Sequence, residues 1–317
     1  MGENEATRDK KRDQVGTRDR HRTGPGQFEG NGAVVSRMTG AFLRAALMVL
    51  MISMPSLFLQ DVSSDTTQIV VLVAILAFLM TFVEYFSEYP SMIEFRFAPP
   101  FNRLRFGALF LTILLLSLIF GSKAMPTDIG MLSARLGGHL GNAMDFPYSP
   151  VRLVVLMLPA EADASVVASV RMAAGLSYTM SILMLFVFLS LVRLFGWPTR
   201  RGAFNVWINL PMFDPTGGGD VMRRLRRDAA LNIVLGILLP FLIPALIKAS
   251  ASLIDPITME NPQTLIWTMS AWAFLPASLI MRGIALSRVA DLIAEKRARA
   301  DARAKAKSDE KERFQTV

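Results

Sequence analysis

Long uncharged apolar runs are the feature that most restricts how this chain can fold. Residues 69–83 and residues 108–120 contain no charged side chain. A helix rises about 1.5 Å per residue, so about 20 apolar residues cross the hydrocarbon core of a bilayer, which is about 30 Å thick. Lipid offers no hydrogen-bond partner to an exposed backbone, so these runs must be helical. We therefore expect an all-α integral membrane protein.

Apolar stretches of this kind divide the chain into three regions. The predicted six-helix transmembrane domain covers residues 38–287, with spans at about 42–59, 68–85, 106–120, 172–192, 229–247 and 264–281. Residues 1–37 are polar and almost free of apolar side chains, which predicts a disordered basic tail. Residues 288–317 are rich in Ala and in charges of both signs, which predicts a charged helix or tail.

Lysine and arginine are distributed unevenly between the loops. The segments 88–105 and 200–227 and both terminal segments are basic, whereas residues 60–67 and 249–263 contain no Lys or Arg. Basic loops stay in the cytoplasm, and an even number of spans places both termini on one side. We expect a multi-pass protein of the cell inner (plasma) membrane, bacterial in origin, with cytoplasmic N and C termini. The net charge of +8 then reflects contact with anionic lipid and not with nucleic acid.

Composition also narrows the chemistry. The chain has no cysteine, which excludes disulfides, thiolate metal sites and iron–sulfur clusters. Its two histidines, His21 and His139, lie outside the predicted spans, so histidine-ligated haem inside the membrane is disfavoured. Catalysis is disfavoured too, since histidine is the commonest general base. We predict no catalytic residue, no metal site and no cofactor.

The stretch DPTGGGDVMRRLRRD, residues 214–228, raises the question of a phosphate-binding loop. A P-loop requires a Lys after its glycines and a buried strand before them, and this stretch has neither. Asp220 is instead expected to cap the following helix. The favoured interpretation is a connection followed by a positive-inside anchor. Whether the glycines at 217–219 bind an anion stays open, as does contact of an anionic headgroup with the nearby arginines: Arg223, Arg224, Arg226 and Arg227.

The preceding segment, residues 203–213, is unusually apolar for a cytoplasmic loop. It contains Trp207 and Phe213 among other large apolar side chains. Such a segment lies in the membrane interface, packs under the bundle or contacts a partner. Trp207 and Phe213 therefore join the four arginines as predicted contacts for anionic lipid or a membrane-protein partner.

Three polar residues near or within spans form a hypothetical ion site. Glu84 and Glu88 are four residues apart at the end of the second predicted span, and Asn232 lies in the fifth. Acids within spans often mark ion paths. The alternative for Glu84 is a salt bridge at the interface, with Arg96 or Arg103 among its partners. Prolines in the last two spans, including Pro240, either kink the helices or free carbonyls for ion binding.

The long loop between the third and fourth spans contains two structured segments. Residues 129–143 have apolar side chains at helical spacing, which predicts an amphipathic helix that lies on the membrane surface or covers the bundle. The apolar run 151–158 is too short to span, so it is interfacial, re-entrant or buried against the bundle. Both belong to the expected periplasmic side.

Three functions remain after these exclusions. The first is a non-enzymatic accessory, scaffold or assembly protein that acts through protein or lipid contacts. The second is a small-solute or lipid transporter, which needs polar groups facing a cavity in mid-membrane. The third is a lipid-modifying intramembrane enzyme that uses residues other than histidine. Charged ends and apolar loops favour the first.

Overall fold

The computed structural model describes residues 25–60, 62–198, 205–213, 220–250 and 259–315, and all regular structure in these ranges is helical. Six of the helices are long and apolar enough to cross a membrane. The predicted all-α, six-span class is therefore confirmed. The protein is a multi-pass membrane protein.

The helices extend beyond the predicted spans. The six long ones are α1 (Pro25–Phe58), α2 (Ser64–Phe86), α3 (Phe101–Gly121), α6 (Ala164–Phe195), α8 (Val221–Ser250) and α9 (Pro262–Gln315). The short ones are α4 (Asp128–Met144), α5 (Pro150–Met157) and α7 (Val206–Asn209). Residues 25–37, which we expected to belong to a disordered tail, are helical and continue into the first span. The rest of that tail lies outside the described residues.

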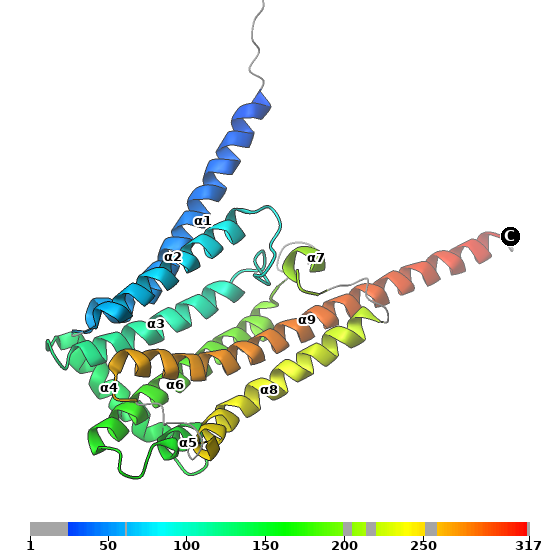
Figure 1. Cartoon of the computed structure of the whole chain (residues 1–317). Coiled ribbons are helices and arrows are strands. Elements are labelled where there is room, and N and C mark those ends of the chain that lie inside the picture. The colour runs from blue at the N-terminus through cyan, green and yellow to red at the C-terminus, as the bar shows by residue number, and fades with distance from the viewer. Residues whose placement is uncertain (1–24, 61, 199–204, 214–219, 251–258, 316–317) are drawn as a thin grey trace, which may run out of the picture.

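Helix α9 is the centre of the bundle. It packs against α8, α6, α3 and α1, and its charged C-terminal part continues as one helix past the ends of its neighbours (Figure 1). Helix α2, by contrast, packs against α1 and against no other described helix. Among contacts between described helices, the α1–α2 pair is therefore joined to the bundle through α1, which contacts α3 and α9.

The bundle has two distinct ends. We call the end formed by loop 87–100, the segment 205–213 and the start of α8 the basic end. The opposite end carries α4 and α5 (Figure 1). Each end has its own buried core. One centres on Phe101, Phe188 and Trp197 near the basic end, and the other contains Leu116 and Ile266.

Side chains fix where several helices begin and end. Ser63, Thr127 and Ser149 each accept a hydrogen bond from a first-turn amide of α2, α4 and α5, respectively. Asp163 caps α6 in the same way, and its hydrogen bonds with Ser165 lower the pKa of its carboxyl. Gly196 ends α6 with a φ of 64°, a left-handed conformation that glycine adopts without steric cost.

Helix α4 confirms the predicted element, but its apolar stripe does not cover the bundle. The buried face consists of small residues instead: Gly130, Ser133, Gly137 and Gly141. The apolar side chains, including Leu132 and Leu136, are exposed. Small residues at an interface let helix backbones approach closely. Gly141 lies so close to α6 that a Cβ there would be 2.9 Å from the Met172 Cα atom.

Helix α5 accounts for the short apolar run after α4. Val151 and Val154 are fully buried, and the helix packs against α6 and α8. Of the three interpretations of this run, burial against the bundle is confirmed. Eight residues cannot cross a bilayer, so the side chains gain stability by packing on longer helices.

Pro244 of α8 frees a backbone carbonyl, which then accepts a hydrogen bond from α9. Pro244 has no N–H, so the carbonyl of Pro240 loses its helical hydrogen bond. The Trp272 indole Nε1 of α9 donates to that oxygen at 3.2 Å. In the same contact region, a Cβ on Gly236 would be 2.6 Å from the Pro276 oxygen. The freed carbonyl therefore joins two helices and is not left to bind an ion.

The close approach of α4 to α6 predicts the effect of one methyl group. Gly141→Ala places a Cβ 2.9 Å from the Met172 Cα atom and 3.0 Å from the Arg171 oxygen, both backbone atoms. We expect the free energy of unfolding to fall by about 1–3 kcal/mol, as for other overpacked sites. Thermal unfolding in detergent, followed by circular dichroism, measures the change.

Gly138 supplies the matched control on the same helix. A Cβ there meets nothing within 4 Å, so Gly138→Ala is expected to leave stability unchanged or to raise it by up to about 1 kcal/mol. Equal melting temperatures for the two alanine variants would show that the α4–α6 contact is not tight.

The indole–carbonyl contact predicts a coupling between two residues. Trp272→Phe removes the donor and should cost about 1 kcal/mol beyond the loss of packing, because the Pro240 carbonyl is then buried without a partner. Pro244→Ala restores a backbone N–H for that carbonyl. The Trp272→Phe substitution should therefore cost less in the Pro244→Ala background. A double-mutant cycle on unfolding in detergent tests this, and additive effects would contradict it.

Candidate functional site

The polar residues of the basic end begin with Glu84, near the end of α2. Its Oε1 accepts hydrogen bonds from the backbone amides of Ser91, Met92 and Ile93 at 2.8–2.9 Å, and its Oε2 accepts one from the Ser91 hydroxyl. The side chain is only 7% exposed. A carboxylate can accept several such bonds because it carries two oxygens and a full charge. Glu84 thus fixes the first turn of loop 87–100.

Arg96, which belongs to the same loop, binds back to the end of α2. Its guanidinium donates to the backbone oxygens of Glu84, Tyr85 and Ser87 at 2.6–2.9 Å. These are carbonyls at the C-terminal end of α2, which have no partner within the helix and attract a cation. Burial lowers the pKa of the Arg96 guanidinium, and the nearby Glu84 charge raises it. Since arginine stays protonated at any ordinary pH, the cap persists.

The salt bridge proposed for Glu84 from the sequence is wrong in detail. Among the described residues, Glu84 forms none. Its charge is satisfied by backbone amides, and Arg96 binds carbonyls instead of the carboxylate. The interfacial, structural interpretation of this acid nevertheless fits the geometry better than an ion path does.

An aromatic cluster lies beneath this loop. Phe95, Phe101, Phe188 and Trp197 pack together with ring centroids 4.6–6.0 Å apart. Phe95 has a φ of 56°, which costs about 1–3 kcal/mol for a residue with a side chain. The Trp197 indole also donates to the Ala98 oxygen at 3.2 Å. Burial of these rings holds the strained turn in place.

Asn209 joins the α7 segment to the same loop. Its backbone oxygen accepts from the Phe95 amide at 2.7 Å, and its Oδ1 accepts from the Phe97 amide at 3.1 Å. The neighbouring Leu210 is 1% exposed. The described part of segment 203–213 therefore packs under the bundle, one of the three interpretations its composition left open. The side chain of Trp207 lies outside the described part.

A partly buried ion pair connects the loop to the central helix. Glu94 receives two hydrogen bonds from Arg282 of α9, at 2.6 and 2.8 Å. Arg105 of α3 lies near this pair, over the rings of Phe101 and Phe274. Loss of Arg282 would leave the Glu94 carboxylate, which is 10% exposed, without its partner, and this is destabilising. The contact therefore fixes the loop against α9.

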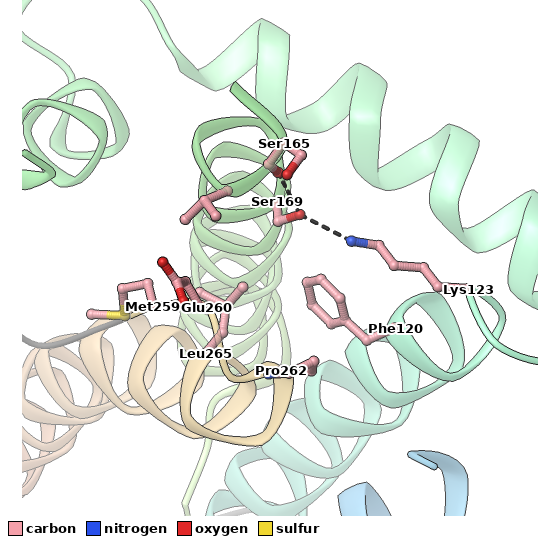
Figure 2. Close-up of a pocket in the computed structure, with 9 residues that line it drawn as sticks. Phe120, Lys123, Ser165, Ser169, Met259, Glu260, Pro262 and Leu265 are labelled. Carbon is pink, nitrogen blue, oxygen red and sulfur yellow. Dashed lines mark hydrogen bonds between the residues drawn. The ribbon is translucent and has the colours of Figure 1, made fainter. Parts of the chain in front are cut away.

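The opposite end holds a small pocket between α3, α6 and α9 (Figure 2). Its volume is about 100 Å³. Lys123 points toward α6, where its Nζ donates to the Ser169 hydroxyl at 3.1 Å, and the Phe120 ring lies 5.0 Å from the same atom. Glu260 lines a different side. The pocket thus combines a cation, a carboxylate and hydroxyls in the space of a few water molecules.

A second ion cluster ties the long loop to the bundle at this end. The Asp145 carboxylate lies 2.9 Å from Arg152 of α5 and 2.8 Å from Arg171 of α6. The carboxylate is nearly buried. One acid between two arginines holds the end of α4 against both neighbouring helices.

The structure does not bring the predicted ion-site residues together. Glu88 lies beyond the end of α2 and is exposed, so it does not share a helix face with Glu84. The Asn232 amide donates to the Asp228 oxygen of its own helix at 2.7 Å. Because α2 and α8 are not in contact, Glu84 and Asn232 belong to separate parts of the molecule.

The predicted lipid-contact arginines are also spread around their helix. Arg226 pairs with Asp291, Arg227 lies 3.6 Å from Asp228, and Arg224 lies over the Phe213 ring. Arg223 is exposed. These pairs do not exclude a lipid, so the lipid contact stays a prediction.

The predicted cap at the start of α8 is present. The Asp220 carboxylate accepts from the Met222 amide at 3.3 Å and from Arg297 at 2.9 Å, and the bond from Arg297 is the main cause of its lowered pKa. The glycines at 217–219 lie outside the described residues.

In three comparisons, no protein-family model, no curated protein and no solved structure matched the chain. Within the described residues, no three His, Cys, Asp or Glu side chains are grouped as metal ligands would be. The charged side chains at the two ends of the bundle form the contacts within the chain described above.

Sequence reasoning missed the polar residues that join distant segments. Glu94, Asn209, Asp145 and Lys123 carried no signal, since each is a single polar residue in a loop or at a helix end. Glu94 is the only acid between residues 89 and 102, which is consistent with a local partner for the arginines around it but does not point to Arg282.

The amide contacts of Glu84 predict a specific loss. Glu84→Gln keeps one accepting oxygen but removes the charge and the second acceptor, so at least one loop donor is left without a partner. We expect the free energy of unfolding to fall by about 1–3 kcal/mol. Hydrogen exchange at the Ser91, Met92 and Ile93 amides should become faster.

Glu88→Gln is the control, because Glu88 is exposed and its side chain forms no ion pair among the described residues. The Glu88→Gln substitution should leave both the free energy of unfolding and the rate of amide hydrogen exchange unchanged. Unchanged exchange in the Glu84 variant would show that the carboxylate does not hold the loop.

Proposed function

We propose that this protein is a non-enzymatic membrane scaffold or assembly component that binds another membrane protein through α2. The supporting observation is that α2 packs against fewer helices than the other long helices do. It is long and apolar enough to span the bilayer, yet α1 is its one neighbour among the described helices.

The exposed side of α2 has the pattern of a helix–helix contact. Its most exposed apolar side chains recur at alternating intervals of three and four residues: Ile69, Leu72, Leu76, Leu79 and Val83. We call these five residues the α2 stripe. This spacing brings side chains to one seam that a second helix can pack against. Packing between side chains, not the hydrophobic effect, drives such association in lipid.

The remaining parts of the proposal concern orientation. The excess of Lys and Arg favours a cytoplasmic basic end in a plasma membrane. The charged extension of α9 would then project into the cytoplasm, where its exposed residues are available to a partner. The joined loop 87–100 and α7 segment would form the cytoplasmic surface of the bundle.

One observation favours a second function, passage of a small polar solute. Four serine hydroxyls in α3 and in the membrane-spanning parts of α6 and α9 are buried and lack a hydrogen-bond partner among the described residues: Ser117, Ser177, Ser270 and Ser278. Buried polar groups are normally paired. The pocket at Lys123 lies at the end of the same three helices.

The test is photo-cross-linking in native membranes with the full-length chain. A photoreactive amino acid at Leu72, in the α2 stripe, is compared with one at Phe186 of α6. The two positions are matched, since they are 68% and 67% exposed. We expect a discrete cross-linked protein from Leu72 and only lipid adducts from Phe186. Leu72→Ala/Leu76→Ala should abolish co-purification of that protein in mild detergent.

The outcomes separate the alternatives. A cross-link to a second copy of the chain would make the stripe a homo-oligomer contact. Lipid adducts alone from Leu72, together with a homogeneous particle that contains no other protein, would overturn the scaffold proposal. Solute flux in proteoliposomes would then be measured, with Ser177→Ala and Ser270→Ala as the variants.

A further inference from the structure

Arginines from three elements gather around Tyr85 at the basic end. The guanidinium carbon of Arg44, on α1, lies 4.8 Å from the Tyr85 ring centroid, and that of Arg96 lies 5.6 Å from it. Arg103 at the start of α3 is also within electrostatic range of Tyr85, and Arg37 is within range of Arg96. We call these four arginines the Tyr85 cluster.

Within the described residues the Tyr85 cluster forms no salt bridge, and Glu84 is the one acid that acts electrostatically on Tyr85 and Arg96. Its oxygens accept hydrogen bonds from the amides and hydroxyl of residues 91–93 and none from an arginine, and its single charge offsets only part of the charge of four arginines. Arg37, Arg44 and Arg103 form no salt bridge there. Arg44 donates to the Gly40 oxygen of its own helix, which does not neutralise it. An excess of positive charge at one surface favours binding of an anion.

The surface next to this cluster is apolar. Phe42 of α1, Val83 and Phe86 of α2 and Phe97 of the loop are exposed large side chains close in sequence to the arginines. Helices α2 and α3 are not in contact with each other, and α1 packs against both. A soluble anion requires the cations alone, whereas a phospholipid matches the cations with its phosphate and the exposed apolar side chains with its acyl chains.

We propose that the Tyr85 cluster binds the phosphate of an anionic phospholipid in the leaflet at the basic end. Arg44 and Arg103 supply the donors, because Arg96 is already committed to the α2 carbonyls. Arginine binds phosphate through paired N–H donors, and the Tyr85 hydroxyl is an additional donor. This site goes beyond the scaffold function, since it requires no protein partner.

The experiment is native mass spectrometry of the full-length protein, titrated with phosphatidylglycerol or with phosphatidylcholine. Arg44→Gln/Arg103→Gln tests the site. Arg299→Gln/Arg303→Gln on the solvated part of α9 is the matched control, with the same loss of charge. We expect the control to bind phosphatidylglycerol like the wild type, and the site variant to bind it at least about tenfold more weakly. Inorganic phosphate, which lacks acyl chains, should not displace the lipid.

Two results would overturn the proposal. Unchanged affinity in the site variant would show that the cluster is not the site, and an equal loss in the control would show that binding reflects net charge alone. Arg44→Lys/Arg103→Lys keeps the charge and should retain intermediate affinity, which separates loss of binding from loss of folding. Because no variant touches the α2 stripe, partner cross-linking and lipid binding can fail independently.

Discussion

The structure depends on satisfying backbone polar groups wherever a membrane helix ends or is interrupted. A carbonyl or amide without a partner costs far more near lipid than in water. Arg96 meets this demand at the end of α2, Glu84 does so for the loop that follows, and Trp272 does so at the proline of α8. In each case the side chain that supplies the hydrogen bond also joins two separate segments. The same hydrogen bonds therefore pair the backbone polar groups and hold the segments together.

The two ends of the bundle differ in the polar contacts that hold their segments together. At the basic end, loop 87–100 is held by Asn209 of the α7 segment, by Arg282 of α9 and by a layer of aromatic rings. At the opposite end, one carboxylate, Asp145, holds α4, α5 and α6 together. A partly buried ion pair adds little net stability, but loss of one partner destabilises the fold. These pairs therefore determine which segments come into contact.

Sequence alone predicts the parts of this fold that depend on one-dimensional patterns. Apolar run length gave six spans, and the pattern of residues 129–143 correctly predicted a helix there. Two kinds of information were missing. The contact of α4 uses Gly137 and Gly141, so its apolar side chains, which dominate the pattern, point away from the bundle. The ion pair of Glu94 with Arg282 joins residues far apart in the chain, and no local pattern identifies such a partner.

The continuous helix α9 has a mechanical consequence. Its extension from Glu295 to Gln315 measures about 30 Å at the usual rise per residue, and it belongs to the same helix that contacts four other helices inside the bundle. Any tilt of α9 within the bundle therefore also displaces Gln315 laterally. Glu94, bound to Arg282, and the Pro240 oxygen of α8, bound to Trp272, hold the part of α9 inside the bundle, so the position of the extension depends on these two contacts.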